Sequence, residues 1–305
     1  MVSLSDIRAF FRGSISINEP LAGYTSMRIG GPVDYFMEPA DKDDLVSIVR
    51  YFRQNKFDFI MVGRGSNMLV SDDGFRGAAI NLEEKFSDVR LEDGDVVAEA
   101  GAGLSKLVDF CIQHGKAGLE WAAGIPGTVG GAIVMNAGAH GGETADQLVE
   151  VEVLRGSEIV TVPKSSISFG YRRSGLESDI VLSGRFRLPE GDREEINQRR
   201  RTFIQQRNAS QPVNMPNSGS IFKNPSGNYA ARLIDAANLK GKRVGGAQIS
   251  EKHANFIVNT GNATASDVLT LIDLARRTVY QNAGILLELE IRLVGFPNDV
   301  REKVA

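Results

Sequence analysis

Helix-like and strand-like patterns alternate over the first part of the chain. Apolar side chains recur at three- and four-residue spacing over residues 43–55, which predicts an amphipathic helix. The apolar run at 57–62 predicts a strand, and shorter strands are expected at 68–70 and 78–80, on either side of a Ser-Asp-Asp-Gly turn. A helix followed by several short strands is typical of a mixed fold.

Strand patterns dominate from about residue 81. The expected strands are 96–100, 149–154, 159–162, 180–188, 255–258 and 285–294, and the expected helices are 105–114, 190–207, 229–237 and 266–281. In the last strand, alternation places Ile285, Leu287, Leu289 and Ile291 on one face and Glu288, Glu290 and Arg292 on the other. The last helix has Ser and Asp at its start and Gly284 past its end, as helix capping favours.

Composition and charge narrow the class of protein. Lys and Arg number 35 against 38 Asp and Glu, so the net charge of −3 gives no basic footprint for nucleic acid. Hydrophobic residues make up 42% and charged residues 24%, which is ordinary for a soluble globular protein. The single cysteine, Cys111, excludes a disulfide framework, and the three histidines lie too far apart in sequence to suggest a metal site.

Two segments bear on cellular location. Residues 1–18 lack the apolar run of an export signal and are expected to form a short amphipathic helix. Residues 121–142 carry no formal charge, but seven glycines and Pro126 would leave the backbone unsatisfied in lipid. We therefore expect glycine-rich loops around a buried segment in a cytoplasmic protein that does not enter the membrane.

Glycine is the outlier of the composition, with 33 in 305 residues. The sequence Gly-Arg-Gly-Ser-Asn at 63–67 follows a predicted strand, and closely spaced glycines let backbone amides converge on an anion such as a diphosphate. Met68 stands where a Gly-x-Gly-x-x-Gly motif needs its third glycine, so a Rossmann site is not supported. A plain tight turn is the alternative.

A second glycine cluster spans residues 124–138. Several glycine breaks in this uncharged segment suggest backbone laid against a large planar or phosphorylated ligand, to which Asn136 could offer its amide. A sharply bent crossover between sheets is the alternative.

Ser220 lies in the sequence Asn-Ser-Gly-Ser-Ile-Phe-Lys-Asn-Pro at 217–225. Its hydroxyl, next to a glycine and close to Lys223 and Asn224, could be a proton donor beside an anion-binding pair. No Gly-x-Ser-x-Gly motif is present, which disfavours an acyl-enzyme hydrolase. Taken singly, the loop serine, Glu290, Arg172 and Arg173 are each also compatible with an ordinary structural or solvated role, and Cys111 and His253 are expected to be structural.

Eight segments, taken in their order along the chain, resemble the UDP-N-acetylenolpyruvoylglucosamine reductase (MurB) family over nearly the whole length. They are 24–31 (Tyr-Thr-Ser-Met-Arg-Ile-Gly-Gly), 62–69 (Val-Gly-Arg-Gly-Ser-Asn-Met-Leu), 120–131 (Glu-Trp-Ala-Ala-Gly-Ile-Pro-Gly-Thr-Val-Gly-Gly), 169–174 (Phe-Gly-Tyr-Arg-Arg-Ser), 219–225 (Gly-Ser-Ile-Phe-Lys-Asn-Pro), 239–241 (Leu-Lys-Gly), 250–256 (Ser-Glu-Lys-His-Ala-Asn-Phe) and 287–292 (Leu-Glu-Leu-Glu-Ile-Arg). The resemblance implies an α+β fold, with a two-part FAD-binding region of the vanillyl-alcohol-oxidase type and a C-terminal α+β substrate-binding domain. The implied domains are 1–80, with 295–305 returning to it, then 81–190, and finally 191–294.

The resemblance also implies a reaction. NADPH would reduce a non-covalently bound FAD, and hydride would then pass to the enolpyruvyl ether of UDP-N-acetylglucosamine, giving the lactyl ether used in peptidoglycan precursor synthesis. The partners implied are these two small molecules, and no obligate protein partner is evident.

Functional residues carry over position by position. Ser220 matches the family's proton donor, Arg172 would stabilise the developing enolate, and Glu290 would assist if it were protonated. The implied FAD-binding residues are Gly63, Arg64, Gly65, Ser66, Asn67, Met68, Gly101, Gly127, Thr128, Gly130, Gly131, Asn136 and Gly138, and the implied substrate-binding residues are Tyr171, Arg172, Lys223 and Asn224.

The chain departs from the family pattern in two places. Only residues 173–179 separate Arg172 from the strand at 180, so the tyrosine-bearing insertion of one branch is absent. The lysine that some members carry before the serine loop has no clear counterpart near Gln211. Another FAD-dependent oxidase or dehydrogenase and a non-enzymatic flavin or nucleotide-sugar sensor are the alternatives, and the joint presence of Ser220, Arg172 and Glu290 argues against both.

Overall fold

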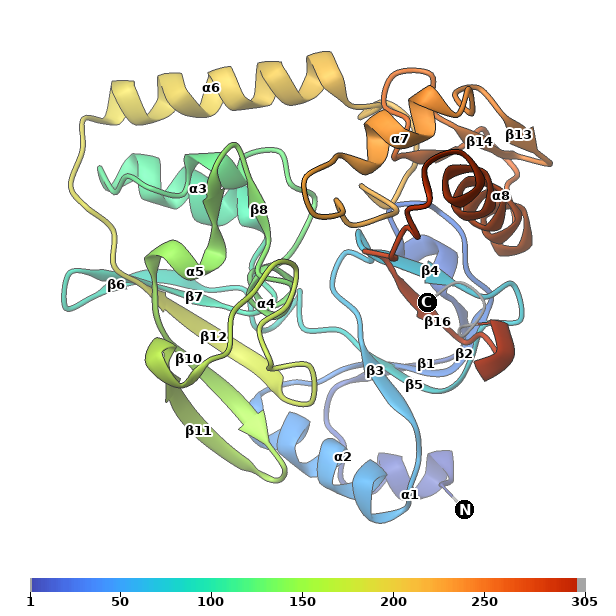
Figure 1. Ribbon diagram of the computed structural model, residues 1–305. Coiled ribbons are helices and arrows are strands. Elements are labelled where there is room, and N and C mark those ends of the chain that lie inside the picture. The colour runs from blue at the N-terminus through green and yellow to red at the C-terminus, as the bar shows by residue number, and fades with distance from the viewer. Residues whose placement is uncertain (1, 301–305) are drawn as a thin grey trace. The chain divides into compact units, whose positions relative to one another are not determined.

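The computed structural model describes residues 2–300, which form two compact units (Figure 1). Unit 1 comprises the chain up to Ile17, Tyr35–Gly63 and Gly77–Gln206, and unit 2 comprises Asn18–Asp34, Arg64–Arg76 and the chain from Arg207 onward. The chain passes from one unit to the other within β1 (Ser14–Pro20), β2 (Pro32–Glu38) and β5 (Phe75–Ile80). Of the expected return segment 295–305, residues 301–305 lie outside the described part.

Unit 1 contains a five-stranded antiparallel sheet in the order β11-β10-β12-β7-β6. Its strands are β6 (Val89–Glu92), β7 (Asp95–Glu99), β10 (Leu148–Arg155), β11 (Glu158–Pro163) and β12 (Ile180–Phe186). Helix α4 (Val129–Val134) packs on β12 and β7. A Cβ on Gly184 of β12 would lie 2.7 Å from the Cδ1 of Ile133, so a larger residue here would require the Ile133 side chain to move.

The other elements of unit 1 surround a single apolar core. They are α1 (Leu4–Arg8), α2 (Lys42–Gln54), β3 (Phe59–Met61), α3 (Leu104–Gln113), η2 (Glu120–Ala122), β8 (Gly138–Ala139), β9 (Gly142–Glu143), α5 (Thr144–Gln147), η3 (Lys164–Ser166) and α6 (Arg193–Ser210), whose last residues belong to unit 2. In α2, Asp41 caps the first turn by accepting from the amide of Asp44, and Leu45, Ile48 and Phe52 are buried. The strand order β1-β2-β5-β3 forms a second sheet.

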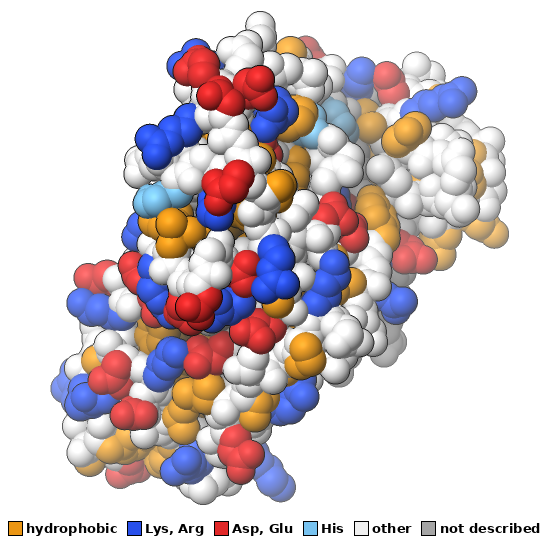
Figure 2. Space-filling view, turned by 90° about the vertical axis from the view of Figure 1, so that its left-hand side faces the viewer, with side chains coloured by type: hydrophobic (Ala, Val, Ile, Leu, Met, Phe, Trp, Pro, Cys, Tyr) orange, Lys and Arg blue, Asp and Glu red, His pale blue; other side chains and the backbone are white. Residues whose placement is uncertain are grey.

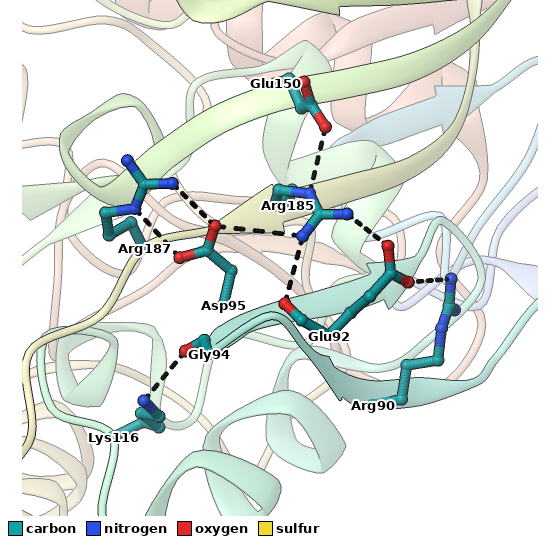
Figure 3. Close-up of polar contacts among 8 residues, drawn as sticks. All are labelled: Arg90, Glu92, Gly94, Asp95, Lys116, Glu150, Arg185 and Arg187. Atoms are coloured by element: carbon teal, nitrogen blue, oxygen red, sulfur yellow. Dashed lines mark hydrogen bonds and ion pairs between the residues drawn. The ribbon is translucent and has the colours of Figure 1, made fainter.

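An ion-pair network joins the strands β6, β7, β10 and β12 of unit 1 (Figure 3). Arg185 of β12 pairs with Glu92 and, at 3.1 Å, with Glu150, while Arg187 binds both carboxylate oxygens of Asp95 at 3.0 and 2.9 Å. The hydrogen bond from Arg187 lowers the pKa of Asp95, with Arg185 adding to the effect. These pairs fix the β6–β7 hairpin to the middle of the sheet.

Unit 2 is built around helix α8 (Ala265–Ala283), which lies against β13 (Arg243–Val244) and β14 (Ala247–Ile249) in Figure 1. Thr264 and Asp267 form a capping box at its start, and Gly284 ends it with a φ of 67°. The remaining elements are η1 (Leu21–Tyr24), β4 (Met68–Val70), α7 (Ala230–Ala236), β15 (Ile257–Asn259) and β16 (Arg292–Val294), with β4 and β16 paired in parallel. The apolar face of α8 supplies much of the core of this unit.

The mixed helix and strand content confirms the predicted α+β class, and most predicted elements lie within two or three residues of the observed ones. Two expectations were wrong. Residues 285–294 alternate in burial as predicted, but only Arg292–Val294 is a regular strand, because the preceding segment pairs with residues 221–223 through a single isolated bridge. Within the described residues 2–18, only Leu4–Arg8 is helical, and β1 begins at Ser14.

The helices and the surface also bear on the expectations from composition. Among residues 2–300, no helix is both long and apolar enough to cross a bilayer. Figure 2 shows acidic and basic side chains intermixed over one face of the molecule. Segment 121–142 folds as predicted into glycine-rich turns around buried side chains, including Trp121, Val129 and Ile133.

Candidate functional site

The glycine loop of unit 2 begins where strand β3 of unit 1 has ended. Gly65 has a φ of 52°, and a Cβ there would lie 2.3 Å from the carbonyl oxygen of Tyr24, so only glycine fits. Within the described residues, the amides of Gly65 and Ser66 donate to no protein acceptor. Two neighbouring unpaired amides suit a diphosphate, and this loop therefore fits the cofactor that the sequence implies.

Asn67 and Met68 connect this loop to residues 290–292 within unit 2. The Nδ2 of Asn67 donates to the carbonyl oxygen of Glu290 at 3.1 Å, and its own carbonyl oxygen accepts from the amide of Arg292 at 2.9 Å. Met68 opens β4, opposite Arg292 of β16. The predicted FAD loop and the predicted catalytic Glu290 are thus neighbours in one unit, a relation that the sequence does not show.

The loop before Ser220 is held by Asn217. Its Oδ1 accepts from the amide of Gly219 at 2.9 Å, its Nδ2 donates to Met215 at 2.8 Å, and its carbonyl oxygen accepts from the hydroxyl of Ser26 at 2.6 Å. Gly219 has a φ of 74°, which turns the chain into Ser220. The half-buried Ser220 hydroxyl makes no hydrogen bond to any residue in the described range 2–300, and is therefore available to a ligand.

Ser220 and Glu290 lie on neighbouring extended segments of unit 2. The amide of Glu290 donates to the carbonyl oxygen of Ile221 at 2.8 Å, and the amide of Lys223 donates to that of Glu288 at 2.9 Å. Phe222 and Leu289 form the bridge between these bonds. Unit 2 thus brings together the predicted proton donor, the predicted active-site glutamate and the predicted substrate-binding lysine.

The two polar residues after Ser220 have partners of their own. Lys223 Nζ lies 3.5 Å from the carboxylate of Glu288, whose side chain is 72% exposed. Asn224 is exposed, and its Oδ1 accepts from the amide of Ala230 at 3.0 Å at the start of α7. Lys223 is therefore a cation with only a loose, solvated counter-ion.

In unit 1, the predicted FAD-binding glycines serve mainly close packing. A Cβ on Gly101 would lie 2.1 Å from the carbonyl oxygen of Leu82, and one on Gly63 would lie 2.7 Å from the hydroxyl of Thr128. The amides of Gly101 and Gly130 already donate to protein carbonyls at 2.8 Å, and Gly131 donates to the Thr128 hydroxyl at 3.3 Å. These amides are not free to bind an anion, but Gly131 itself is exposed, so a flat ligand could lie against this turn.

Arg172 occupies a two-residue turn closed by reciprocal backbone bonds between Gly170 and Arg173. Its φ of 58° lies in the left-handed region, which is unfavourable for a residue with a side chain. The guanidinium lies over the ring of Tyr171, with its Cζ 5.0 Å from the ring centre, and donates to the carbonyl oxygen of Gly138 at 3.2 Å. Strain at a fixed cation is typical of a functional position.

Asn136 supports this turn from within unit 1. It is fully buried, its Nδ2 donates to the carbonyl oxygen of Gly170 at 3.1 Å, and its Oδ1 accepts from the amide of Ala145 at 3.0 Å. Both ends of the amide are thus bound to backbone, which gives Asn136 a role in holding the Arg172 turn. Its predicted contact with the flavin stays a prediction.

Cys111 and His253 show the features of structural residues. Burial raises the pKa of Cys111 to about 12, so its thiol is not a nucleophile at neutral pH. Burial also lowers the pKa of His253, whose ring packs edge-on against Phe256 at 4.7 Å. Among residues 2–300, no group of three or more His, Cys, Asp or Glu side chains could hold a metal ion.

Sequence reasoning assigned no role to Ser26, Asn217 or Asn255, although Ser26 and Asn255 lie in segments that carry the resemblance. Ser26 and Asn255 act on backbone groups distant in sequence, as in the 2.6 Å bond from Ser26 to Asn217, whereas Asn217 holds its own loop. Side-chain amides give no periodic or spacing signal, so only the fold shows which backbone groups they reach.

Comparison with known proteins defines first the class and then the family. An FAD binding domain family matches residues 33–162, which identifies an FAD-binding domain in this part of the chain. The family of UDP-N-acetylenolpyruvoylglucosamine reductase C-terminal domains matches residues 211–294.

Full-length relatives agree with both matches. The UDP-N-acetylenolpyruvoylglucosamine reductase of Chloroherpeton thalassium is 46% identical over 99% of this chain and 100% of its own, and that of Geobacter metallireducens is 43% identical over 95% and 97%. The crystal structure of UDP-N-acetylenolpyruvylglucosamine reductase (MurB) from Thermus caldophilus has a TM-score of 0.80 at 37% identity, and covers 93% of this chain and 100% of its own. The chain belongs to the UDP-N-acetylenolpyruvoylglucosamine reductase family.

The family relationship confirms the predicted enzyme class and the predicted FAD cofactor. It does not test the individual site residues or the three-domain division, which stay predictions.

Proposed function

We propose that this chain reduces the enolpyruvyl ether of UDP-N-acetylglucosamine to the lactyl ether in peptidoglycan precursor synthesis, with NADPH as reductant. The observation that carries the proposal is the pairing of the Ser220 segment with the Glu290 segment inside unit 2. FAD supplies, when bound, the relay of hydride from NADPH to the terminal methylene carbon of the enolpyruvyl group. Besides this hydride, reduction of the double bond needs one proton, which the protein must deliver to the carbon that bears the carboxylate.

Ser220 delivers that proton. Its hydroxyl makes no hydrogen bond within residues 2–300, it stands next to the left-handed Gly219, and Glu290 lies on the adjacent segment. A serine hydroxyl is a weak acid, so a neighbouring group or water must return the proton after each turnover. Glu290 in its protonated form can assist, whereas a bare carboxylate beside a developing enolate would repel it.

Arg172 stabilises the negative charge that develops on the substrate carboxylate. A guanidinium stays protonated throughout the working pH range and can bind a carboxylate through two nitrogens. The strained turn and the contact with Tyr171 hold this cation in one place before substrate arrives, so that little reorganisation is needed.

Other contacts follow from the residues around these groups. Lys223 and Asn224 bind the anionic part of the substrate, and Tyr171, with 49% of its surface exposed, offers a ring beside Arg172. Gly65, Ser66 and the adjoining residues 63–68 hold the FAD diphosphate, while residues 127–138 and Gly101 line the flavin. The three-domain division and the cytoplasmic location stay predictions.

An anaerobic turnover experiment tests the proposal. NADPH and the enolpyruvyl sugar are mixed with the FAD-loaded protein, and the product is identified by mass spectrometry. One NADPH consumed for each product heavier than the substrate by two hydrogens supports the proposal. If the anaerobic mixture gave no product and NADPH were oxidised in air, the result would instead favour a flavin oxidase on the same fold.

A further inference from the structure

Asn255 holds the segment that carries Ser220 through both ends of its side-chain amide. Its Oδ1 accepts from the amide of Phe222 at 3.0 Å, and its Nδ2 donates to the carbonyl oxygen of the same residue at 2.8 Å. Its own carbonyl oxygen accepts from the amide of Ile221 at 2.9 Å. Asn255 is 2% exposed and Phe222 is 1% exposed, so water does not compete for these bonds.

Residues 221–223 have a hydrogen-bonding partner on each edge, as the middle strand of a three-stranded sheet does. On one edge, the carbonyl oxygen of Ile221 and the amide of Lys223 bond to the segment that carries Glu290. On the other edge, the two backbone groups of Phe222 bond to the amide of Asn255, which takes the place of a residue in a third strand. A single side chain thus completes the pairing that holds the Ser220 segment against the Glu290 segment, in which Ile221 lies opposite Glu290.

We propose that Asn255 is a positioning residue for proton delivery, holding the segment that carries Ser220 against the segment that carries Glu290 through the backbone of Phe222. This inference rests on the proposed function, because it assigns Asn255 to the step in which Ser220 gives up its proton. Without the amide, both buried backbone groups of Phe222 lose their partners, and the segment must shift to satisfy them. A shift of about 1 Å in a reacting group can slow a step by about 10²-fold.

The test separates the two half-reactions of the FAD-loaded, full-length protein by stopped-flow absorbance. Asn255→Ala is expected to be reduced by NADPH within about twofold of the wild-type rate, while its reoxidation by the enolpyruvyl sugar slows by about 10-fold to 10²-fold. A merely structural residue would slow both steps alike or neither of them.

A buried asparagine of the same unit supplies the matched control. Asn259 is 6% exposed, its Nδ2 donates to Met27 at 3.0 Å, and its Oδ1 accepts from Gly261 at 2.9 Å, but its side chain makes no hydrogen bond to residues 220–223. Asn259→Ala is expected to lower the unfolding temperature to a similar extent and to leave both half-reactions at their wild-type rates. If it slowed reoxidation as much as Asn255→Ala, general loosening of unit 2 would explain both results and the inference would be overturned.

A third variant distinguishes failure of this inference from failure of the proposed function. Ser220→Ala is measured beside the others. If Ser220→Ala slows reoxidation and Asn255→Ala does not, only the positioning role is wrong; if Ser220→Ala has no effect, the proton-donor assignment itself is wrong. If Asn255→Ala does not accumulate with FAD, Asn255→Gln takes its place, since it keeps the amide one methylene further out. Asn255→Gln is expected to slow reoxidation more than reduction, by a smaller factor than Asn255→Ala. If it slowed both half-reactions equally, or neither of them, the inference would be overturned.

Discussion

The backbone amide of Glu290 donates a hydrogen bond to the carbonyl oxygen of Ile221 over 2.8 Å. This bond links Glu290 to Ile221, the residue after Ser220, although 69 positions separate Ile221 from Glu290 along the chain. Because the link runs through main chain, substituting either side chain leaves the pairing of the two segments in place. The roles of Ser220 and Glu290 can therefore be tested by mutation without dismantling the site.

Arg172→Gly is expected to separate stability from activity. Glycine adopts the observed φ of 58° without the steric cost that arginine bears, so the unfolding temperature should stay level or rise by an amount worth about 1 kcal/mol. Reoxidation by the enolpyruvyl sugar should slow by about 10²-fold or more, because the cation for the developing charge is gone. Thermal unfolding and half-reaction rates check this; a marked fall in unfolding temperature would contradict the strain at this turn.

Lys223→Ala should weaken substrate binding more than turnover. Loss of a charged hydrogen-bond donor costs about 1.5–3 kcal/mol, which corresponds to a rise in KM of about 10-fold or more with a smaller change in kcat. Glu288→Gln is the control, because it removes the exposed counter-ion at 3.5 Å and leaves Lys223 itself intact. Steady-state kinetics decide: an equal rise in KM for both variants would mean that the ion pair, and not the cation, matters.

Asn136→Asp tests whether this buried residue serves the Arg172 turn or the flavin. The substitution replaces the donor that faces the carbonyl oxygen of Gly170 with an acceptor, so the turn should loosen. We expect FAD to remain bound and reoxidation by the sugar to slow by about 10-fold or more. Fluorescence titration with FAD measures the first quantity and stopped-flow absorbance the second. Loss of FAD affinity with an unchanged reoxidation rate would favour the direct flavin contact.

Stability should fall at acidic pH partly through Asp95. The hydrogen bond from Arg187 lowers the pKa of Asp95 in the folded state, below the value of about 3.9 in the unfolded chain. The carboxylate therefore stabilises the fold fully above about pH 4, and this contribution is lost as the pH falls through the folded pKa. Arg187→Gln should make the loss shallower, as measured by urea midpoints between pH 6 and pH 2.

Arg277→Gln is the control for this prediction. It breaks an exposed pair with Asp273 on helix α8, and an exposed pair of this kind contributes little to stability. The urea midpoint of Arg277→Gln should fall with decreasing pH as steeply as that of the wild type. If Arg187→Gln also kept the wild-type slope below pH 4, the contact with Asp95 would contribute nothing to acid stability.

The elements that the sequence predicted best have strong local signals. Helix α8 shows its 3.6-residue period together with Ser266 and Asp267 at its start and Gly284 past its end, so its bounds were predicted closely. The N-cap itself, Thr264, is a finding of the structure. The apolar alternation of residues 285–294 was correct for burial but wrong for regular structure before Arg292. Alternation reports which side chains face the core, whereas a strand also needs a continuous partner, and only β4 supplies one.

The candidate site shows the same limit. Gly65 could be predicted as a turn glycine, because a close approach of backbone has a signature in residue type. The bonds of Asn136 to the Arg172 turn and of Asn255 to Phe222 could not, because an asparagine gives no indication of which distant backbone group it will reach. Long-range polar contacts are fixed only when the apolar core has brought the segments together.

The central claim is that Ser220 gives the proton in the second half-reaction. The most direct test is a single-turnover stopped-flow trace at the flavin band, recorded without oxygen for the wild type and Ser220→Ala. NADPH should bleach both proteins at the same rate, and the enolpyruvyl sugar should restore the colour of Ser220→Ala about 10²–10⁴-fold more slowly than that of the wild type. Equal slowing of both steps, or no slowing of either, would contradict the account.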